Sequence, residues 1–309
     1  MTMPSQASIL EIEGISKRFQ SVFAVRDLSL AVPRGSIYGI IGPNGAGKTT
    51  TIRMILDILA PDTGTISFHF RNTTVAQNDS IGFLPEERGL YKRMTVEDVL
   101  VYMAQLKSVP PNRSRPKIDA WLSRMELSEW KKRKVQELSK GMQQKVQFIS
   151  TILHEPELVI LDEPFAGLDP VNQELLKDIV LELKAGGATV LFSSHVMEQA
   201  EKICDHLCMI DHGQKVLDGP LSQVKSGFGA DILVVEGDLP GAALAVLPGV
   251  IAVRSERLRH ELTLAASTDH QQLMSRILTL GRVDGIQRLQ PSLHSIFLTM
   301  AGKNSKTGA

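Results

Sequence analysis

The stretch Gly42-Pro-Asn-Gly-Ala-Gly-Lys-Thr-Thr50 decides the fold of this chain. An apolar run at residues 36–41 precedes it, and residues 51–59 follow with apolar side chains at helical spacing, which predicts a strand, a glycine-rich loop and a helix. Glycines let backbone N–H groups turn toward a phosphate, and the positive end of the helix dipole faces the same point. The stretch therefore predicts a phosphate-binding loop in which Lys48 reaches the β- and γ-phosphates and Thr49 completes a Mg²⁺ shell.

Composition limits the partners that the chain can have. Its 309 residues suffice for two domains, and 34 basic side chains balance 34 acidic ones, so we expect no nucleic acid partner. The longest weakly charged apolar stretch, residues 239–253, contains Pro240 and Pro248, and residues 1–8 lack the basic and apolar regions of a signal peptide. We therefore expect a cytoplasmic protein that reaches a membrane only through a partner.

Two cysteines, Cys204 and Cys208, stand four residues apart. A zinc or redox site needs further ligands at matching spacing, which the neighbouring sequence does not supply. Buried or half-buried thiols are the interpretation that we favour.

The middle of the chain changes from strand to helix patterns. Strands are expected at residues 8–13, 23–32, 65–70 and 81–85, and helices at about 95–106, 116–125 and from 139 onward. This helical insertion, about residues 90–150, predicts a separate lobe on the nucleotide-binding core. Within it, the basic run at residues 131–134 indicates a solvated segment rather than a nucleic-acid patch.

Candidate catalytic groups follow two apolar runs. Residues 158–161 are apolar and lead into Asp162 and Glu163, as in a buried parallel strand that ends at a catalytic crevice. Asp162 is expected to hold Mg²⁺ through water, and Glu163 to take a proton from an attacking water. His195 ends a second such strand, at residues 189–194, and this position favours a functional histidine over a structural one.

Taken in order, these motifs resemble those of the ATP-binding subunit of an ABC transporter, specifically the bacterial sodium-efflux and drug-export type. The resemblance covers about residues 8–220 and rests on Walker A (Gly42 to Thr49), the signature Leu138-Ser-Lys-Gly-Met142, Walker B (residues 158–162, then Glu163), the D-loop Ala166-Gly-Leu-Asp169, the switch histidine His195, and Phe19 at the aromatic A-loop position. From the residues alone, Phe19 fits either the core or a base-stacking platform. The resemblance implies that the Phe19 ring stacks on the nucleobase of ATP.

The resemblance implies an α/β fold: a P-loop NTPase cassette with an antiparallel β subdomain and a helical lobe, at residues 1–222. It implies ATP and Mg²⁺ as ligands. The implied nucleotide-binding residues are Phe19, Gly42, Pro43, Asn44, Gly45, Ala46, Gly47, Lys48, Thr49, Thr50, Ser139, Gly141 and Asp169. The implied catalytic residues are Glu86, Glu163 and His195, and the metal ligands are Thr49, Glu86 and Asp162.

The resemblance also implies the partners. Two cassettes face each other head to tail, and Ser139 and Gly141 of one contact the γ-phosphate held by the other. One Walker A and one signature per chain imply a homodimer or a paired cassette, with two sites under C2 symmetry. The chain is then expected to hydrolyse ATP and to drive transport, with export favoured, through a separate integral membrane permease on the inner face of the cell membrane.

Three residues depart from the common family pattern. Glu86 occupies the Q-loop position of a glutamine, which adds negative charge near the γ-phosphate. Lys140 and Met142 replace glycine and glutamine in the signature, while Ser139 and Gly141 are kept.

The alternative function is a soluble ABC ATPase acting on ribosomes or DNA, but such proteins generally fuse two cassettes or insert long coiled coils, and this chain has neither.

Residues 223–309 are expected to form a small accessory domain. Strand and helix patterns alternate there in the order βαββαβ, which predicts a ferredoxin-like α+β module. Its end, Pro291-Ser-Leu-His-Ser-Ile-Phe-Leu298, resembles the C-terminal extension of the export-type ATPases. Two roles stay open for the module: a brace for the dimer and a sensor of the transported compound.

Overall fold

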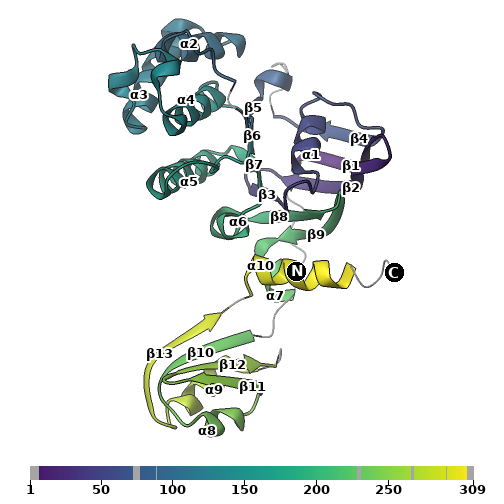
Figure 1. The fold of residues 1–309 in the computed structure, drawn as a ribbon, viewed down its shortest axis with the longest axis vertical. Coiled ribbons are helices and arrows are strands. Elements are labelled where there is room, and N and C mark those ends of the chain that lie inside the picture. Colours follow the sequence, from purple (N-terminus) through teal and green to yellow (C-terminus); the bar gives the residue numbers. More distant parts are fainter. Residues whose placement is uncertain are drawn as a thin grey trace. The chain divides into compact units, whose positions relative to one another are not determined.

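The computed structural model describes residues 7–71, 77–87, 89–227, 231–265, 268–289 and 291–304 (Figure 1). The chain divides into two compact units, Met1–Gly219 and Pro220–Ala309, and each has its own hydrophobic core. The boundary expected at residue 222 from the sequence stays a prediction.

The centre of the first unit is a sheet whose described strands follow the order β5-β6-β7-β3-β8-β9. Their bounds are β3 (Ile37–Ile41), β5 (Ile81–Leu84), β6 (Leu158–Asp162), β7 (Thr189–Ser194), β8 (His206–Asp211) and β9 (Gln214–Pro220). β5, β6, β7, β3 and β8 run parallel. Every residue of β3, β6 and β7 is buried, as expected for parallel strands covered on both faces.

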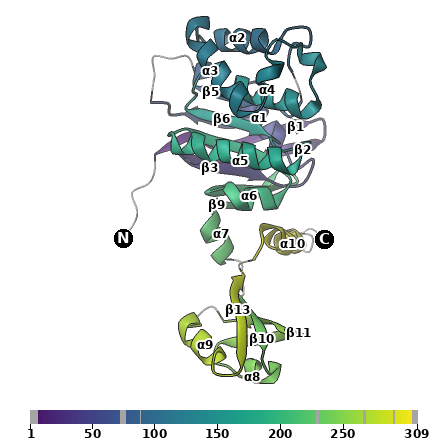
Figure 2. The same ribbon diagram turned by 90° about the vertical axis from the view of Figure 1, so that its left-hand side faces the viewer.

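Helices cover one face of this sheet and a second sheet covers the other. Figures 1 and 2 place α5 (Pro170–Ala185) and α6 (Met197–Ile203) on one side, and α1 (Lys48–Ile55) with the strand order β2-β1-β4 on the other. The second sheet is antiparallel, with bounds β1 (Ser8–Phe19), β2 (Val22–Pro33) and β4 (Thr63–Phe68). Apolar side chains of both sheets and of α1 form one core between them. The predicted cassette fold, with its antiparallel subdomain, is confirmed.

Two helix bounds differ from the prediction. α1 begins at Lys48 and ends at Ile55, whereas the pattern predicted a helix through residue 59; Asp57 takes a left-handed conformation, with φ of 55°, and stops it. α3 (Pro111–Arg124) begins five residues before the predicted start, because Pro111 occupies the first turn, where a missing N–H costs nothing. Pro116, predicted to open the helix, lies inside it.

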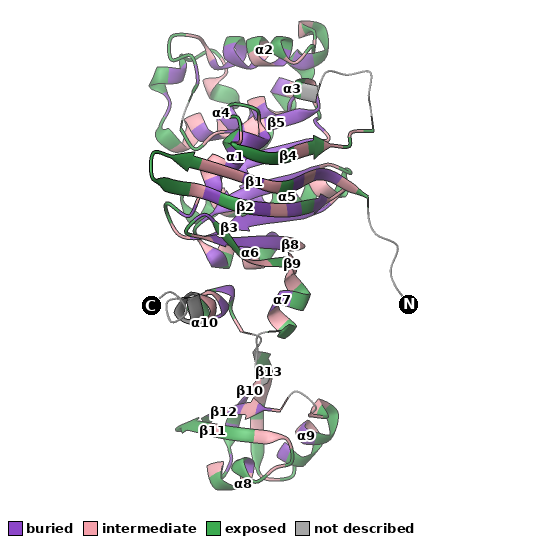
Figure 3. Ribbon diagram, turned by 90° about the vertical axis from the view of Figure 1, so that its right-hand side faces the viewer, coloured by how far each residue is buried: buried purple, intermediate pink, exposed green. Residues whose placement is uncertain are grey.

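The helical lobe consists of α2 (Val96–Leu106), α3 and α4 (Lys140–Ile152), with short 3₁₀ turns at Ser128–Trp130 and Val135–Glu137. The apolar side chains of α2 are buried at Val96, Val99 and Leu100, whereas Leu106 is 58% exposed. The outer side of α2 is green in Figure 3. Lys132 of the basic run is exposed as predicted, yet it and Lys131 both pair with the buried carboxylate of Glu97.

The second unit contains the predicted βαββαβ order. Its elements are α7 (Leu221–Gly227), β10 (Asp231–Asp238), α8 (Gly241–Ala245), β11 (Val250–Glu256), β12 (Arg259–Leu264), α9 (His270–Ile277), β13 (Arg282–Leu289) and α10 (Leu293–Asn304). The antiparallel sheet has the order β11-β12-β10-β13. The strands before and after the central β11–β12 hairpin, β10 and β13, are therefore neighbours, as in a ferredoxin-like fold. Leu233, Leu262 and Ile277 belong to its core.

Both cysteines are free and buried, as predicted. Desolvation raises the pKa of each thiol well above its ordinary value, so neither is a ready nucleophile. A Cβ at Gly39 on β3 would lie 2.7 Å from Cys204 Sγ, which places this thiol in close packing with the central sheet. Among the described helices, none combines the length and apolar character needed to cross a bilayer.

Candidate nucleotide-binding site

The candidate site lies where four neighbouring strands end. Gly42 follows β3, Glu163 follows β6, His195 follows β7, and Glu86 comes two residues after β5. Carboxyl ends of parallel strands meet at one edge of a sheet, and this edge is where α/β proteins bind ligands. A cavity of about 370 Å³ opens here, and Glu86, Glu163 and His195 line it together with the glycine-rich loop.

The glycine-rich loop needs its glycines for two reasons. Gly45 and Gly47 have φ of 79° and 106°, a region that side chains with a Cβ rarely adopt. A Cβ at Gly42 would lie 2.1 Å from Ile210 O, and one at Gly47 would lie 2.3 Å from Ala24 O. α1 begins immediately after Gly47, so its free N–H groups open toward the cavity. This cradle fits a phosphate group.

Lys48 is a buried cation at the bottom of the cavity. Its side chain is 6% exposed, and Nζ donates to Gly42 O at 3.0 Å and to Pro43 O at 3.1 Å. Nζ also lies 3.6 Å from Glu163 Oε1. A buried ammonium group is stable only with such partners, and a phosphate in the cavity can replace the carboxylate as its counter-ion.

Asp162 and Thr49 supply the oxygen atoms expected for a metal. Asp162 is 3% exposed, and Thr49 Oγ1 donates to its Oδ1 at 3.4 Å. Carboxylate and hydroxyl oxygens suit Mg²⁺, which takes its remaining ligands from water and phosphate oxygens. The residues present therefore fit a Mg²⁺–nucleotide complex.

Ser193 is a site residue that the sequence analysis missed. In the parallel pairing of β6 and β7 it stands opposite Asp162, and its hydroxyl donates to Asp162 Oδ1. The hydroxyl oxygen of Ser193 in turn accepts a hydrogen bond from the Glu163 backbone N–H at 3.1 Å. One hydroxyl thus orients both acidic residues. The signal in the sequence was a serine next to the end of the strand that carries His195.

Glu163 is held in a specific orientation. Its backbone is left-handed, with φ of 49°, a conformation that costs on the order of 1 kcal/mol and is often found at functional sites. Its side chain is 9% exposed, and Oε1 lies 2.9 Å from His195 Nδ1. The carboxylate therefore faces the cavity between a histidine and Lys48, where it can accept a proton.

The predicted site residues fall into two groups. Those that line the cavity are Asn44, Gly45, Gly47, Lys48, Thr49, Thr50, Glu86, Glu163 and His195, joined by Ala24 and Ala166, which were not predicted. Gly42 and Pro43 do not line the cavity, but their carbonyl groups accept hydrogen bonds from Lys48, which does. Asp162 likewise accepts a hydrogen bond from the lining residue Thr49. Ala46 is buried within the loop. Phe19, Ser139, Gly141 and Asp169 are not among the lining residues.

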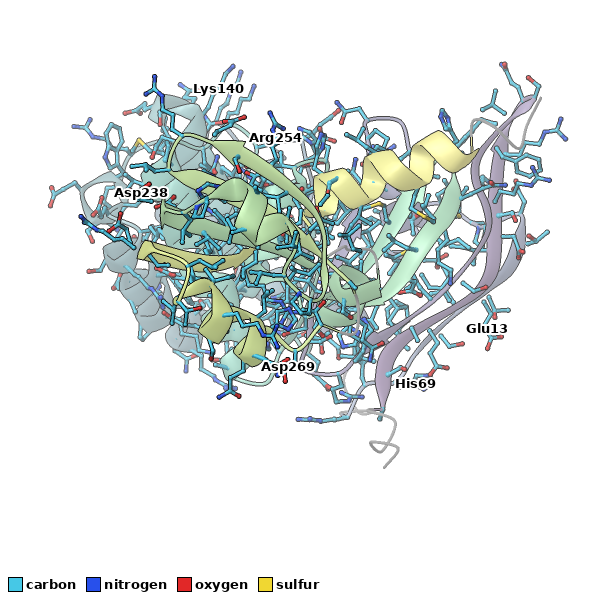
Figure 4. The ribbon with its side chains drawn as sticks, turned by 90° about the horizontal axis from the view of Figure 1, so that it is seen from below. Glu13, His69, Lys140, Asp238, Arg254 and Asp269 are labelled. Carbon is cyan, nitrogen blue, oxygen red and sulfur yellow. The ribbon has the colours of Figure 1, made fainter. Side chains whose placement is uncertain are left out.

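Ser139 and Asp169 have a visible structural task. Ser139 is the N-cap of α4 and accepts from Met142 N at 3.3 Å, and Asp169 is the N-cap of α5 and accepts from Asn172 N at 3.0 Å. Hydrogen bonds from Asn172 also hold the pKa of Asp169 below its ordinary value. Lys140, next to Ser139, is exposed and projects from the surface (Figure 4).

Phe19 is 50% exposed at the end of β1. It pairs with Val22 on β2, and Ala24, two residues further along that strand, lines the cavity. The β1–β2 pairing shifts register between Lys17 and Arg18, so Ala24 is left without a partner on β1.

A larger hollow of about 660 Å³ lies elsewhere in the first unit. Glu157 and Ala188, which line it, precede β6 and β7, so it adjoins the amino ends of these strands. Its charged groups include the pairs Arg124–Glu182 and Lys117–Glu155. It contains none of the predicted site residues, so we assign the ligand to the smaller cavity.

Comparison with known proteins identifies the family of this chain. The family model described as ABC transporter matches residues 25–166, and one described as ATP-binding protein DrrA1-3-like, C-terminal domain, matches residues 219–301. The chain is 41% identical over 294 residues to the uncharacterized ABC transporter ATP-binding protein YhaQ of Bacillus subtilis (strain 168), covering 95% of this chain and 99% of that protein. It is 31% identical to a Nod factor export ATP-binding protein of Ralstonia nicotianae, covering 96% and 95%.

Solved structures give the same result. The structure of an ATP-binding subunit of an ABC transporter superimposes with a TM-score of 0.66 at 31% identity, covering 72% of this chain and 93% of that one. An ATP-binding cassette of an ABC transporter in its ADP conformation gives 0.57 at 28% identity, covering 69% and 91%. The resemblance predicted from the motifs is confirmed, and the chain belongs to the family of ABC transporter ATP-binding proteins.

Proposed function

We propose that the chain hydrolyses ATP at sites shared by two copies and thereby drives export through a separate membrane permease. The observation that carries the hydrolytic part is the placement of Glu163. Its carboxylate lies 2.9 Å from His195 and 3.6 Å from Lys48 in the cavity at the strand ends. A base beside a phosphate cradle is the arrangement that hydrolysis of a phosphoanhydride requires.

Each residue has a separate task in this reaction. The glycine-rich loop and Lys48 bind the phosphates, and Glu163 accepts a proton from the attacking water. His195 orients the Glu163 carboxylate through the hydrogen bond to Oε1. When bound, Mg²⁺ supplies charge neutralisation to the phosphates, and Thr49 and Asp162 are the groups that hold it. Ser193 fixes Asp162 and the Glu163 backbone.

Gly141 supports the sharing of sites between two copies. It lies outside the cavity, and a Cβ there would touch only Leu168 Cδ2, at an ordinary 3.7 Å. Nothing within the described part of the chain therefore requires a glycine at this point in the first turn of α4. A glycine that the chain itself does not need is expected where another molecule approaches the backbone closely. We assign that approach to the nucleotide bound by a second copy.

Export is supported by the relatives and by the second unit. Relatives that match over nearly the whole chain carry names such as Nod factor export and daunorubicin resistance ATP-binding protein, the latter from Streptomyces coeruleorubidus. The second unit matches the C-terminal domain model described as DrrA1-3-like. A solved relative is described as part of a transporter complex, which supports a partner for this chain also. The described helices include none suited to span a bilayer, so we assign the pathway to that partner.

The test of hydrolysis is Glu163→Gln, which keeps the shape of the side chain and removes the base. We expect kcat for ATP to fall by about a hundredfold or more, while ATP binding is retained. Phosphate release and nucleotide binding are measured separately. The control is Glu129→Gln, at an exposed glutamate of the lobe, which we expect to leave kcat unchanged. Turnover like that of the wild type in Glu163→Gln would refute the assignment of the base.

A further inference from the structure

Helix α4 carries three buried polar side chains on one face. Gln144, Gln147 and Thr151 are 9%, 6% and 4% exposed, and their spacing of three and then four residues aligns them along the helix. The neighbouring buried residues of the helix are mainly apolar. A polar side chain in such a place is stable only if it forms hydrogen bonds, so the partners of these three reveal what they do.

The partner of Gln147 lies in the loop that carries Glu86. Gln147 Nε2 donates to Glu87 O at 3.3 Å, and Glu87 directly follows Glu86 in the chain. Glu86 lines the nucleotide cavity, yet it has no hydrogen bond or ion pair with any residue that the structure describes. Among residues 85–87, 89 and 90, this bond is the one described hydrogen bond that ties the loop to α4. Gln147 therefore fixes the backbone beside a carboxylate that has no other restraint among the described residues.

Gln144 and Thr151 make equivalent contacts on either side of Gln147. Gln144 Nε2 donates to Pro164 O at 2.6 Å, and Pro164 directly follows Glu163. Thr151 Oγ1 lies 3.1 Å from Phe83 O, within β5. One face of α4 thus binds the backbone next to both carboxylates that line the cavity, and then the strand that leads to Glu86.

The amide of Gln147 is not needed to fill space. An apolar side chain of similar volume would pack against the same core without the cost of burying a polar group, and Glu87 O could then bind water at the loop surface. The amide adds specificity to the contact between α4 and the loop, because its hydrogen bond selects one backbone atom of the loop, Glu87 O, to lie against the helix. The same helix begins at Ser139 and Gly141, which we assign to the nucleotide of a second copy.

We propose that Gln147 is a positioning residue for ATP hydrolysis. By binding Glu87 O it sets Glu86 in the cavity, and it makes the position of Glu86 follow α4 when the signature residues at the start of that helix engage a nucleotide. This inference rests on the proposed hydrolytic function, of which it names an additional part. Gln147 does not touch the nucleotide; it acts through Glu86.

The test compares two substitutions that remove a buried donor from α4 with little change in volume, in the full chain. Gln147→Met loses the contact to the Glu86 loop, and Thr151→Val loses the contact to β5. Thr151→Val is expected to lower Tm by about 2–4 °C, as for one lost hydrogen bond in a unit of this size, and Gln147→Met by no more than that, because Glu87 O can bind water instead. Only Gln147→Met is expected to lower kcat, by about tenfold, because a misplaced group weakens catalysis while the fold persists.

A double-mutant cycle with Glu86→Ala gives a measurement that a purely structural role would not change. If Gln147 acts through Glu86, Gln147→Met has no further effect on kcat once Glu86 is alanine. The Mg²⁺ concentration for half-maximal ATPase activity is measured in parallel, and we expect Gln147→Met and Glu86→Ala to shift it in the same direction. Kinetic effects that multiply in the double variant overturn the proposal.

The remaining outcomes are equally decisive. An unchanged kcat in Gln147→Met overturns the proposal, and so does an equal loss of kcat in Thr151→Val, since that would indicate general softening of α4. Absence of ATPase activity in the wild type, or turnover that survives Glu163→Gln, refutes the proposed function instead. The wild type and Glu163→Gln therefore stand beside the cycle as the distinguishing controls.

Discussion

At the scale of single residues, the acidic side chains of the candidate site are oriented by hydrogen bonds from neighbouring side chains. Ser193 donates to Asp162 and accepts from the Glu163 backbone, and His195 fixes the carboxylate of Glu163. These contacts set the orientation of the Asp162 and Glu163 side chains, and the left-handed backbone of Glu163 is the local strain that accompanies them.

His154 is a residue whose charge the fold suppresses. Its Nε2 lies 3.1 Å from Ile81 O, and because a carbonyl only accepts, Nε2 carries a proton. Its Nδ1 is buried and has no partner among the described residues. Desolvation lowers the pKa of His154 from 6.5 to about 4, and the nearby Lys107 acts in the same direction.

This lowered pKa predicts that acid destabilises the chain through His154. Between pH 6.5 and about 4 the unfolded state binds a proton that the folded state does not, so the free energy of unfolding falls as pH falls through this window. From about pH 7.5 to about pH 5 the loss is on the order of 2 kcal/mol. His154→Gln keeps a donor for Ile81 O but does not titrate, so urea unfolding at both pH values should show a smaller loss. An equal pH dependence in the variant would contradict this assignment.

At the scale of elements, the close approach of α4 to β5 joins the helical lobe to the central sheet. Gly82 lies at this contact: a Cβ there would stand 2.3 Å from Thr151 O and 2.9 Å from Pro156 Cγ. The glycine thus lets a helix backbone rest directly on a strand. This contact brings Gln147 within reach of the loop that follows β5.

Gly82→Ala is therefore expected to push α4 away from β5. Overpacking of this kind costs on the order of 1–3 kcal/mol of unfolding free energy. Gly89→Ala is the matched control from the following loop, because a Cβ there meets nothing within 4 Å; its effect should stay within about 0.5 kcal/mol. Chemical unfolding of both variants measures the difference. Equal stability of the two would show that α4 does not rest on β5 as the structure has it.

At the scale of the whole molecule, each chain carries one phosphate loop and one signature, and the signature lies outside the cavity that the same chain forms. A complete site, in our proposal, needs two copies. Two inactive variants should then complement each other in a mixed dimer if their substitutions lie in different halves of the site.

Gly141→Glu and Glu163→Gln provide this complementation test. Each variant alone should lack ATPase activity: the first blocks the nucleotide of the other copy, and the second removes the base. Gly141 tolerates a Cβ within its own chain, so its variant is expected to fold. In an equal mixture, half of the dimers are mixed and each has one intact site, which predicts about a quarter of wild-type activity. No recovery on mixing would contradict a shared site.

Much of the fold followed from the sequence because its signals are local. The glycine-rich loop, the apolar runs at residues 158–161 and 189–194, and the βαββαβ order each reflect backbone preferences and periodicity within a short segment. Element ends were less certain: Asp57 stopped α1 early, and Pro111 began α3 early, through conformations that periodicity does not register.

The sequence by itself determined which reactive residue types the chain has and in what order the strands deliver them, and from these it predicted a phosphate cradle, a proton acceptor and a metal site. Only the tertiary structure decided how these residues are held. The hydroxyl of Ser193 reaches Asp162 because β7 pairs with β6 in one register, and Gln147 reaches Glu87 O because Gly82 lets α4 lie on β5. Those contacts join residues that are distant in the chain. They could not be predicted from the sequence because strand pairing and side-chain packing, rather than neighbouring residues, decide which groups meet.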